Sequence, residues 1–318
     1  MMIRKAVLVF SATLLLAGTA FADWQPNKPI RFIVPYPAGG GTDVVARLVA
    51  VKVSDALKQP VVVENKLGAN GAVATDYVVK SPADGYTVLF DAQSAAITPV
   101  ISKVPYDPAK DLQPLAKLIV QAFVIAAAPK TQAKNLGELV QLSKSRPQGL
   151  NAAVPGSAVY LTGELFKLKT GANMTFVQYK GGSQAALALM SGETDIGFMD
   201  VPSVNAQIVA GKVKGLAVTT PRRIKSLPDV PTAAEAGLPD FVVEGWLAAF
   251  LPAHTPADVV ERLNKEINAA LAAPDVVARI EQIGGEPAKT SAGEFTTFFR
   301  SELAKWKDVV VRAKVKVE

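Results

Sequence analysis

A glycine-rich turn between a predicted buried strand and a predicted helix has the residue types for anion binding. Residues 30–35 are mostly apolar, the turn reads Tyr36-Pro37-Ala38-Gly39-Gly40-Gly41, and a periodic segment spans residues 42–58. Glycines let backbone N–H groups approach a ligand without a Cβ in the way, and a helix N-terminus adds unpaired donors and about half a positive charge. The turn therefore favours a carboxylate or phosphate, and we expect Asp43 to cap the helix or orient the turn. A tight turn with no ligand is the alternative interpretation.

Three further turns of this kind follow in the middle of the sequence. They are Pro155-Gly156-Ser157-Ala158-Val159-Tyr160, Gly181-Gly182-Ser183 and Asp200-Val201, and each follows a predicted strand and precedes a predicted helix. Ser157 is placed to cap its helix or to donate its hydroxyl. Because ligands of open α/β sheets bind at the carboxyl ends of parallel strands, the four turns together predict a binding site.

The residues needed for catalysis or metal binding are scarce. His254 is the single histidine and lies in a proline-flanked linker, no G-x-S-x-G motif is present, and the chain has no cysteine. The GK[ST] ending of a P-loop and the spacing of a dinucleotide fingerprint are missing as well. We therefore expect no catalytic residue, no metal and no cofactor. Paired carboxylates for glycoside chemistry stay open, although Asp84, Asp91, Asp107 and Asp111 stand beside turn residues that indicate caps and loops.

Short β-branched runs alternate with longer periodic segments, which is typical of an α/β protein with mostly parallel sheets. The predicted strands are residues 30–35, 61–64, 87–90, 123–127, 150–154, 175–179, 195–199 and 216–219. The predicted helices are residues 42–58, 72–79, 136–145, 160–169, 184–190, 203–210, 257–272, a helix that Pro274 opens, and 292–311. The sequence shows no fixed repeat of the kind that builds solenoids.

Two apolar extended stretches, residues 118–128 and 245–252, interrupt this alternation and are interpreted as crossovers between domains. The first domain is then residues 23–122 plus 246–318, and the second is residues 123–245, inserted as one block. Two chain crossings make a hinge, and a length of 318 residues suits two domains better than one.

The N-terminus predicts export. Arg4 and Lys5 precede a short apolar run, and Ala20-Phe21-Ala22 supplies the small residues of a cleavage site, so residues 1–22 are predicted to be a secretory signal peptide removed after Ala22. An uncleaved membrane anchor is the alternative. Without cysteine, no thioether-linked lipid can form. The net charge of +6 comes from dispersed Lys and Arg, which argues against a nucleic-acid partner.

Ordered blocks along the mature chain resemble the Bug family, the periplasmic receptors of tripartite tricarboxylate transporters. The blocks are Val34-Pro35-Tyr36-Pro37-Ala38-Gly39-Gly40-Gly41-Thr42-Asp43, Pro60-Val61-Val62-Val63-Glu64-Asn65-Lys66, Ala83-Asp84-Gly85-Tyr86-Thr87, Pro105-Tyr106-Asp107-Pro108, Gly163-Glu164-Leu165-Phe166, Tyr179-Lys180-Gly181-Gly182, Leu227-Pro228-Asp229-Val230-Pro231-Thr232 and Glu235-Ala236-Gly237-Leu238-Pro239. The resemblance implies a two-domain periplasmic-binding-protein fold of type II with two hinge crossovers. Such a receptor closes like a Venus flytrap on a small carboxylate and delivers it to a membrane permease.

The resemblance also implies which residues bind the ligand. They are Tyr36, Ala38, Gly39, Gly40, Gly41, Thr42, Asp43, Gln93, Ser94, Pro155, Gly156, Ser157, Ala158, Val159, Tyr160, Gly181, Gly182, Ser183, Asp200 and Val201. The family usually has glycine-rich residues before the position of Ser157 and a histidine at that of Tyr160, so an aromatic carboxylate and a dicarboxylate both stay open.

The expected protein is a periplasmic monomer with a tripartite tricarboxylate-type permease as partner. A sensory module that presents its ligand to a membrane kinase is the alternative, and a periplasmic enzyme comes after it.

Overall fold

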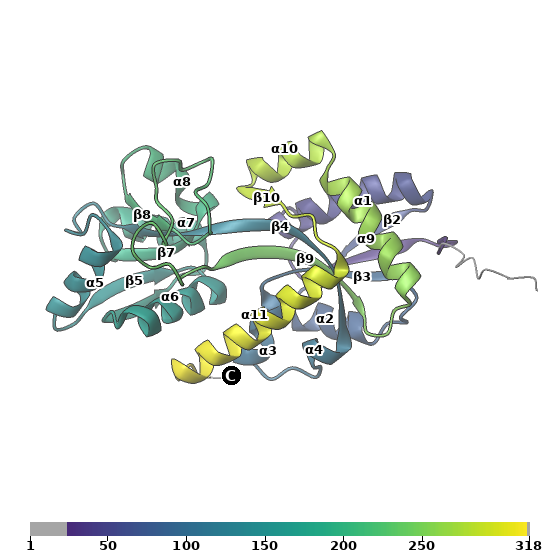
Figure 1. The fold of residues 1–318 in the computed structure, drawn as a ribbon, viewed down its shortest axis with the longest axis horizontal. Helices are drawn as coiled ribbons and strands as arrows, with labels where there is room; N and C mark the ends of the chain where they lie inside the picture. The colour runs from purple at the N-terminus through teal and green to yellow at the C-terminus, as the bar shows by residue number, and fades with distance from the viewer. Residues whose placement is uncertain (1–23, 317–318) are drawn as a thin grey trace, which may run out of the picture.

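Two α/β lobes joined by two long strands make up the described part of the chain (Figure 1). The computed structural model describes residues 24–316, so the predicted signal peptide lies outside the described residues. Within residues 24–316 a 10-stranded sheet runs in the order β2-β1-β3-β9-β4-β7-β5-β6, with β8 and β10 each pairing with β4.

Lobe 1 is built from both ends of the described chain. Its strands are β1 (Ile30–Val34), β2 (Val61–Asn65), β3 (Thr87–Ala92) and β10 (Gly285–Pro287). Its helices are α1 (Gly41–Leu57), the 3-10 turn η1 (Ala69–Gly71), α2 (Ala72–Val79), α3 (Ser94–Ile101), α4 (Pro108–Asp111), α9 (Ala257–Leu271), α10 (Pro274–Gln282) and α11 (Ala292–Arg312). α3 and α4 lie where no element was predicted, because α3 contains Pro99 and α4 is too short to show a helical period.

Lobe 2 is built from the middle of the chain. Its strands are β5 (Leu150–Val154), β6 (Met174–Gln178), β7 (Ile196–Asp200) and β8 (Lys214–Val218). Its helices are α5 (Leu136–Ser145), α6 (Ser157–Thr170), α7 (Gly182–Ser191) and α8 (Val201–Val209). β5 pairs in parallel with β6 and β7, just as β1 pairs in parallel with β2 and β3 in lobe 1.

The connecting strands β4 (Leu112–Ala127) and β9 (Glu244–Pro252) run antiparallel to each other and to their neighbours. β4 pairs with β9 as far as Ala122 and then with β7 and β8 from Phe123 onward. The two predicted crossovers are these strands, but β4 begins at Leu112 instead of residue 118. The expectation of mostly parallel sheets holds for β1 with β2 and β3 and for β5 with β6 and β7. Every pairing of β4 and β9 is antiparallel, including those of β4 with β8 and β10.

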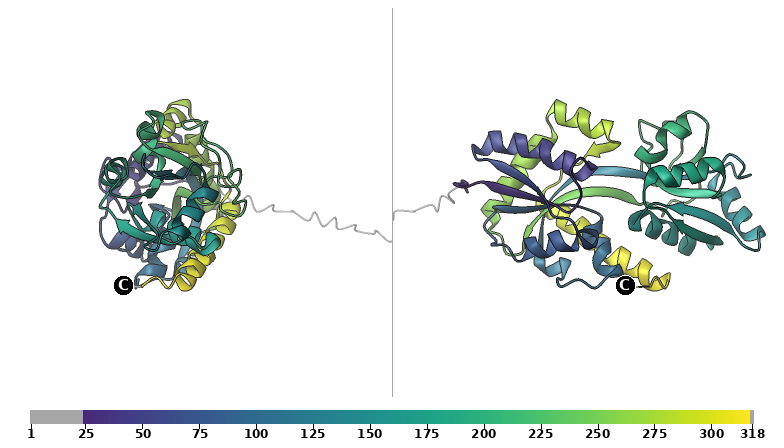
Figure 2. Two further views of the ribbon diagram at one scale, coloured as in Figure 1. Left: turned by 90° about the vertical axis from the view of Figure 1, so that its left-hand side faces the viewer. Right: turned by 180° about the vertical axis from the view of Figure 1, so that it is seen from behind.

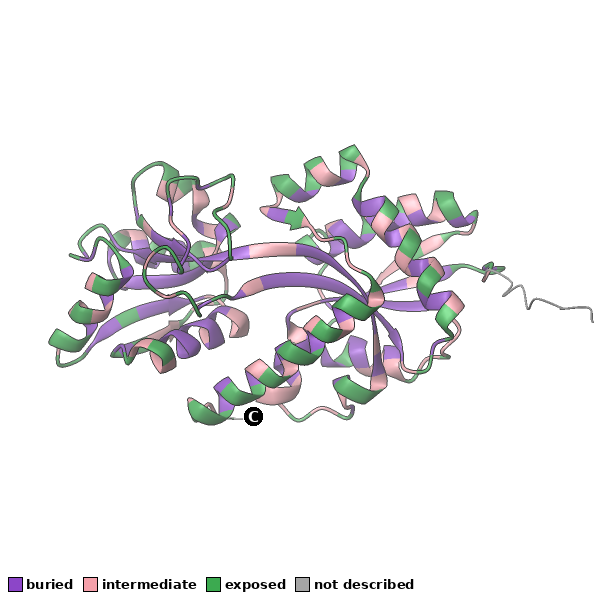
Figure 3. Cartoon of the chain, viewed as in Figure 1, coloured by how far each residue is buried: buried purple, intermediate pink, exposed green. Residues whose placement is uncertain are grey.

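Helices cover both faces of the sheet, as the view from behind also shows (Figure 2). Along β1, Phe32 joins an apolar cluster with residues of α1, α9 and α10, while Ile33 joins one with residues of α2, α3 and α11. The second cluster also includes Phe166 of α6, and α11 contacts both α3 of lobe 1 and α6 of lobe 2. β4 and β9 are buried over most of their length (Figure 3), so the connection between the lobes is part of the core.

Candidate functional site

The carboxyl ends of the parallel strands in both lobes point toward the middle of the molecule. In lobe 1, β3 runs antiparallel to β9 and places Ala92 opposite Leu247. In lobe 2, β7 runs antiparallel to β4 and places Asp200 opposite Phe123. The other parallel strands follow β3 and β7, so the turns after β1 and β3 face those after β5, β6 and β7. Figure 2 (right) shows the N-terminus of α1 pointing toward lobe 2.

The helices that begin at these turns share a missing side-chain cap. Their N-cap residues are Gly40, Gln93, Gly156, Gly181 and Asp200, and in this part of the chain, residues 24–316, none of these N-cap side chains accepts a hydrogen bond from a backbone N–H of the first turn. By contrast, Asp107, Asn135 and Ser291 cap α4, α5 and α11 with side-chain oxygens. α2, α9 and α10 also lack such a cap, so the missing cap matters at the five turns because they face one another. Together they present unpaired N–H donors and positive helix ends to an anion.

Asp43 orients the turn after β1 instead of capping α1. Its carboxylate is buried at 2 % exposure and accepts from the Gly39 N–H at 2.9 Å, from Nε and Nη2 of Arg47 and from the Asn65 amide. The Asn65 amide also donates to the Tyr36 carbonyl at 2.8 Å. The Arg47 guanidinium lowers the pKa of Asp43 to about 2. The charge of Asp43 is therefore balanced inside the turn.

A second buried carboxylate, Asp91, ties the turns after β1 and β3 together. Its Oδ1 accepts from the Tyr36 hydroxyl at 2.9 Å, from the Ser94 hydroxyl at 2.7 Å and from the Ala92 N–H at 2.6 Å. Asp91 is 1 % exposed, and burial raises its pKa to about 6. Burial, followed by the charge of Asp91, raises the pKa of Tyr36 well above its usual range. Asp91 was not among the predicted site residues.

Gln93 and Ser94 point in different directions from the same turn. Ser94 is half-buried and shares a 2.6 Å hydrogen bond with the Tyr36 hydroxyl. Gln93 is 3 % exposed, and its amide reaches the carboxylate of Glu302 on α11 at 3.4 Å. Of the predicted pair, Ser94 therefore presents its side chain near Tyr36, whereas Gln93 faces α11.

The turn after β5 places its predicted residues unevenly. Gly156 is the N-cap of α6 with φ at +148°, so Ser157 is the first helical residue and does not cap the helix as expected. Tyr160 is half-buried, with its ring edge-on to Phe176 at 5.3 Å, and burial raises the pKa of Tyr160. Val159 is 4 % exposed and belongs to the core, so only the backbone of this residue lies at the turn.

The turns after β6 and β7 are packed against each other. A Cβ added to Gly182 would overlap the Ser203 hydroxyl and lie 3.2 Å from Oδ1 of Asp200. The Ser203 hydroxyl donates to Asp200 Oδ2 at 2.6 Å. Ser183 is exposed, and Val201 is buried in the core of lobe 2. Close backbone approach therefore holds these two turns together.

A cavity of about 740 Å³ lies between the lobes at a different place. It is lined by the loop at residues 220–226, the segment at residues 284–290 and part of β4, and none of the predicted ligand residues lines it. Lys117 of β4 and Glu244 of β9 form a 2.7 Å ion pair in its wall. The cavity is therefore separate from the five turns.

Within the described chain, residues 24–316, no cluster of three or more His, Asp or Glu side chains is arranged to hold a metal ion. Among the same residues, no helix combines the length and apolar character needed to cross a membrane.

Two α/β lobes on shared strands, with turns that face one another between them, form the architecture of periplasmic solute-binding proteins. Residues 45–315 match the family described as tripartite tricarboxylate transporter family receptor. The chain belongs to this receptor family, the Bug proteins among them, and the family consists of binding proteins, not enzymes. The resemblance seen in the sequence and the expected fold are thereby confirmed.

Individual relatives match over nearly their whole length. BugT of Bordetella pertussis is 37 % identical over 309 residues, which cover 95 % of this chain and 94 % of that protein. Rpa4515 of R. palustris, solved with adipate, has a TM-score of 0.75 and 31 % identity, covering 91 % of this chain and 98 % of that one. MatC from Rhodopseudomonas palustris, solved with bound malate, has a TM-score of 0.73 and 31 % identity, covering 90 % of this chain and 99 % of that one.

Proposed function

We propose that this receptor captures a small carboxylate between the five turns and delivers it to a membrane permease of the tripartite tricarboxylate type. The observation that carries the proposal is the set of helix N-termini without side-chain caps at strand ends that face one another. Two structural neighbours hold dicarboxylates, adipate and malate. A dicarboxylate matches the arrangement, because one carboxylate can engage each lobe.

In this proposal backbone N–H groups and hydroxyls bind the carboxylate oxygens without an arginine clamp. Arg31 and Arg47, the cations on either side of the first turn in the sequence, are already paired with Glu64 and Asp43. Micromolar affinity corresponds to about −8 kcal/mol, which a few charge-assisted hydrogen bonds and desolvated apolar contacts can supply. The hydroxyls of Tyr36, Ser94 and Tyr160 are the side-chain groups we assign to this role.

Ligand contacts to both lobes favour a closed arrangement, so closure is a population shift about the connecting strands. We place the domain boundaries at residues 122/123, where β4 changes partners, and at residues 245/246, near the start of β9 at Glu244. We also propose that residues 1–22 direct export and are removed, and that the receptor works as a periplasmic monomer.

The test is a thermal unfolding scan of the purified protein with malate, adipate, citrate and benzoate. At a ligand concentration about 100 times Kd, binding adds about 2.7 kcal/mol to the free energy of unfolding and raises the melting temperature by several degrees. Dimethyl esters of malate and adipate serve as matched controls, because they keep the carbon skeleton and lose the charge. An unchanged melting temperature across a broad carboxylate panel, or an equal shift with the esters, contradicts the proposal.

A further inference from the structure

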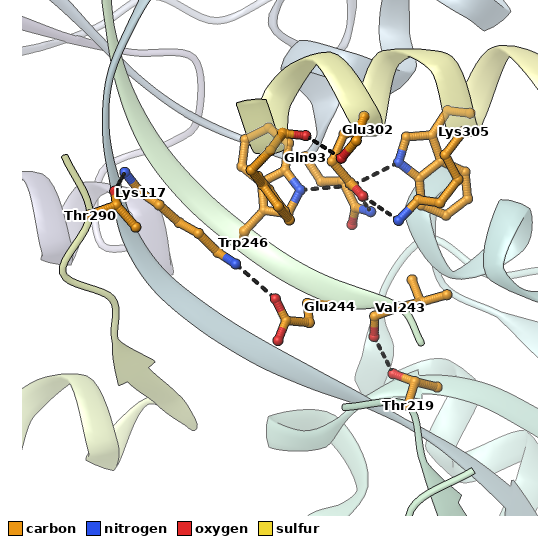
Figure 4. Close-up of polar contacts among 12 residues, drawn as sticks. Gln93, Lys117, Thr219, Val243, Glu244, Trp246, Thr290, Glu302 and Lys305 are labelled. Atoms are coloured by element: carbon orange, nitrogen blue, oxygen red, sulfur yellow. Dashed lines mark hydrogen bonds and ion pairs between the residues drawn. The ribbon is translucent and has the colours of Figure 1, made fainter. Parts of the chain in front are cut away.

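A buried carboxylate on α11, Glu302, gathers donors from three separate parts of lobe 1 (Figure 4). Its Oε2 accepts from the indole N–H of Trp246 at 3.0 Å, from that of Trp306 at 3.0 Å and from the Gln93 amide at 3.4 Å. Its Oε1 pairs with the Lys305 ammonium one turn further along the helix. Glu302 is only 3 % exposed, so these contacts replace water.

Trp306 and Lys305 lie on α11 with Glu302, whereas Gln93 and Trp246 belong to two other elements. Gln93 is the last residue of the turn after β3 and is followed by Ser94. The Gln93 carbonyl accepts from the N–H groups of Ala96 and Ile97 in the first turn of α3. Trp246 lies on β9 opposite Val120 of β4, where the two connecting strands run side by side. Glu302 therefore joins a ligand turn to a strand that connects the lobes.

The neighbours of Glu302 leave little freedom to move. The Trp246 ring is surrounded by α11 rings, with Phe295, Phe298 and Phe299 at centroid distances of 6.1, 5.9 and 6.1 Å. The Oε1 atom of Gln93 is buried without a hydrogen-bond partner among the described residues, so the Gln93 amide is held through its bond to Glu302. Loss of the carboxylate would leave two buried indole N–H groups without an acceptor.

We infer that Glu302 is a positioning residue for ligand capture, which holds the Gln93–Ser94 turn, strand β9 and helix α11 in one relative placement. The inference rests on the proposed function, because it concerns how a ligand at the turn after β3 acts on the connecting strands. A ligand that displaces this turn on binding therefore also displaces β9, because Glu302 binds both. A carboxylate is needed because it has two acceptor oxygens. One oxygen accepts from the two indoles and from Gln93, and the other accepts from Lys305.

The experiment compares three variants by amide hydrogen exchange without ligand and by calorimetric titration with malate and adipate. Glu302→Gln keeps the size but offers one acceptor oxygen, so its amide N–H₂ must face either the indoles or Lys305. Gln93→Met cuts only the link to the turn. Trp306→Phe is the matched control, since it removes one indole donor and leaves the bonds from Gln93 and Trp246 in place.

Glu302→Gln should raise exchange about tenfold at Ala96 and Ile97 and also at Trp246–Ala248, and weaken the better ligand about tenfold. Gln93→Met should raise exchange at Ala96 and Ile97 alone, and this variant decides the matter if Glu302→Gln does not fold. Trp306→Phe should change both readouts less than about twofold. Unchanged exchange at Ala96 and Ile97 in Glu302→Gln or Gln93→Met, or equal effects in Trp306→Phe, overturns the inference.

The two proposals fail in different ways. A wild-type protein that binds no carboxylate contradicts the proposed function, while the exchange measurements without ligand still support or overturn the role of Glu302. Conversely, wild-type binding with unaltered affinity in Glu302→Gln leaves the receptor function standing and removes the positioning role.

Discussion

The two lobes hold the turns that face one another in different ways. In lobe 1 the turns after β1 and β3 are fixed by side chains, since Asp43 binds Gly39, Arg47 and Asn65, and Asp91 binds Tyr36 and Ser94. In lobe 2 the Ser203 hydroxyl donates to Asp200 at the turn after β7, and the Tyr179 hydroxyl of the turn after β6 donates to Glu193, which follows α7. There, glycines at the N-caps of α6 and α7 and close backbone packing take the place of side-chain clamps.

From this difference we expect the two lobes to have different roles in ligand binding. A clamped turn loses little entropy when it binds, so lobe 1 suits the first contact with a carboxylate. Turns with few clamps can adjust to the second end of the ligand as the lobes close. The following changes test this comparison in order of decreasing effect.

Asp43→Ala should have the largest effect, because it leaves Arg47, Asn65 and the Gly39 N–H without their acceptor. We expect a loss of about 3 kcal/mol in the free energy of unfolding at pH 7, measured by urea denaturation, and about a tenfold or greater loss of carboxylate affinity. The pKa of Asp43 is lowered to about 2, so its contribution is complete above the ordinary value of 3.8 and is lost as pH falls through about 2.

Asp200→Ala is the matched control in lobe 2, where the carboxylate accepts a hydrogen bond from the Ser203 hydroxyl. We expect it to cost about 1 kcal/mol. Equal losses in the free energy of unfolding from the two substitutions would show that side chains fix the turns of both lobes equally, which contradicts the comparison.

Asp91→Asn should change how stability depends on pH. The pKa of Asp91 is raised to about 6 in the folded protein, so between pH 4 and 6 the folded state keeps a proton that the unfolded state has lost. Stability of the wild type therefore falls as pH rises through this window, by about 2 to 3 kcal/mol from this group. The asparagine lacks this penalty, so the variant should become more stable than wild type above pH 6, as measured by urea denaturation at several pH values.

The control for this change is Ser94→Ala, which removes a donor to Asp91 and keeps its ionisable carboxyl group. The fall in stability between pH 4 and 6 should persist in that variant. Parallel pH profiles for wild type and Asp91→Asn would show that Asp91 titrates as an ordinary surface carboxylate.

Gly182→Ala should destabilise lobe 2 by about 2 kcal/mol, because the new Cβ overlaps the Ser203 hydroxyl and lies 2.5 Å from its Cβ. Gly181→Ala is the neighbouring control, since a Cβ there has no atom within 4 Å and its φ of −176° suits any residue. Thermal unfolding separates the two. A tolerated Gly182→Ala would mean that backbone contact does not hold the turns after β6 and β7 together.

Much of the fold could be predicted from the residues that begin and end helices and strands. Helices α2 and α5 and strand β5 have the predicted bounds, because glycine, proline and asparagine mark their ends. The first part of β4 was not predicted, since Gln113, Pro114 and Lys117 hide its strand character. Its pairing with β9, which is more than a hundred residues away in sequence, fixes its conformation.

The turns could be found from sequence, but the groups that orient them could not. Asp91 was interpreted as a cap or loop residue, and its role arises because β3 pairs with β1 and brings it to Tyr36, 55 positions earlier. Glu302 lies in the predicted helix at residues 292–311 and was not singled out, because its donors Trp246 and Gln93 lie 56 and 209 positions away. Contacts across such separations leave no local pattern to read.

Gly181→Asp should have the smallest effect on stability and an opposite effect on function. Gly181 is the N-cap of α7 in an extended conformation with open space at its Cβ position, so an aspartate can accept a hydrogen bond from the first turn. We expect the free energy of unfolding to rise by about 0.5 kcal/mol, since glycine is itself a tolerated N-cap. Affinity for malate or adipate should fall about tenfold or more, because the carboxylate occupies the donors and repels the ligand.

Gly181→Asn separates capping from charge, because asparagine caps a helix as well as aspartate does and carries no charge. If α7 donates to the ligand, the asparagine variant also weakens binding, and the aspartate variant weakens it further in a manner that added salt reduces. If neither variant alters the affinity measured by calorimetry while both stabilise the protein, the N-terminus of α7 does not contact the ligand. The capture site would then rest on lobe 1 and the turns after β5 and β7.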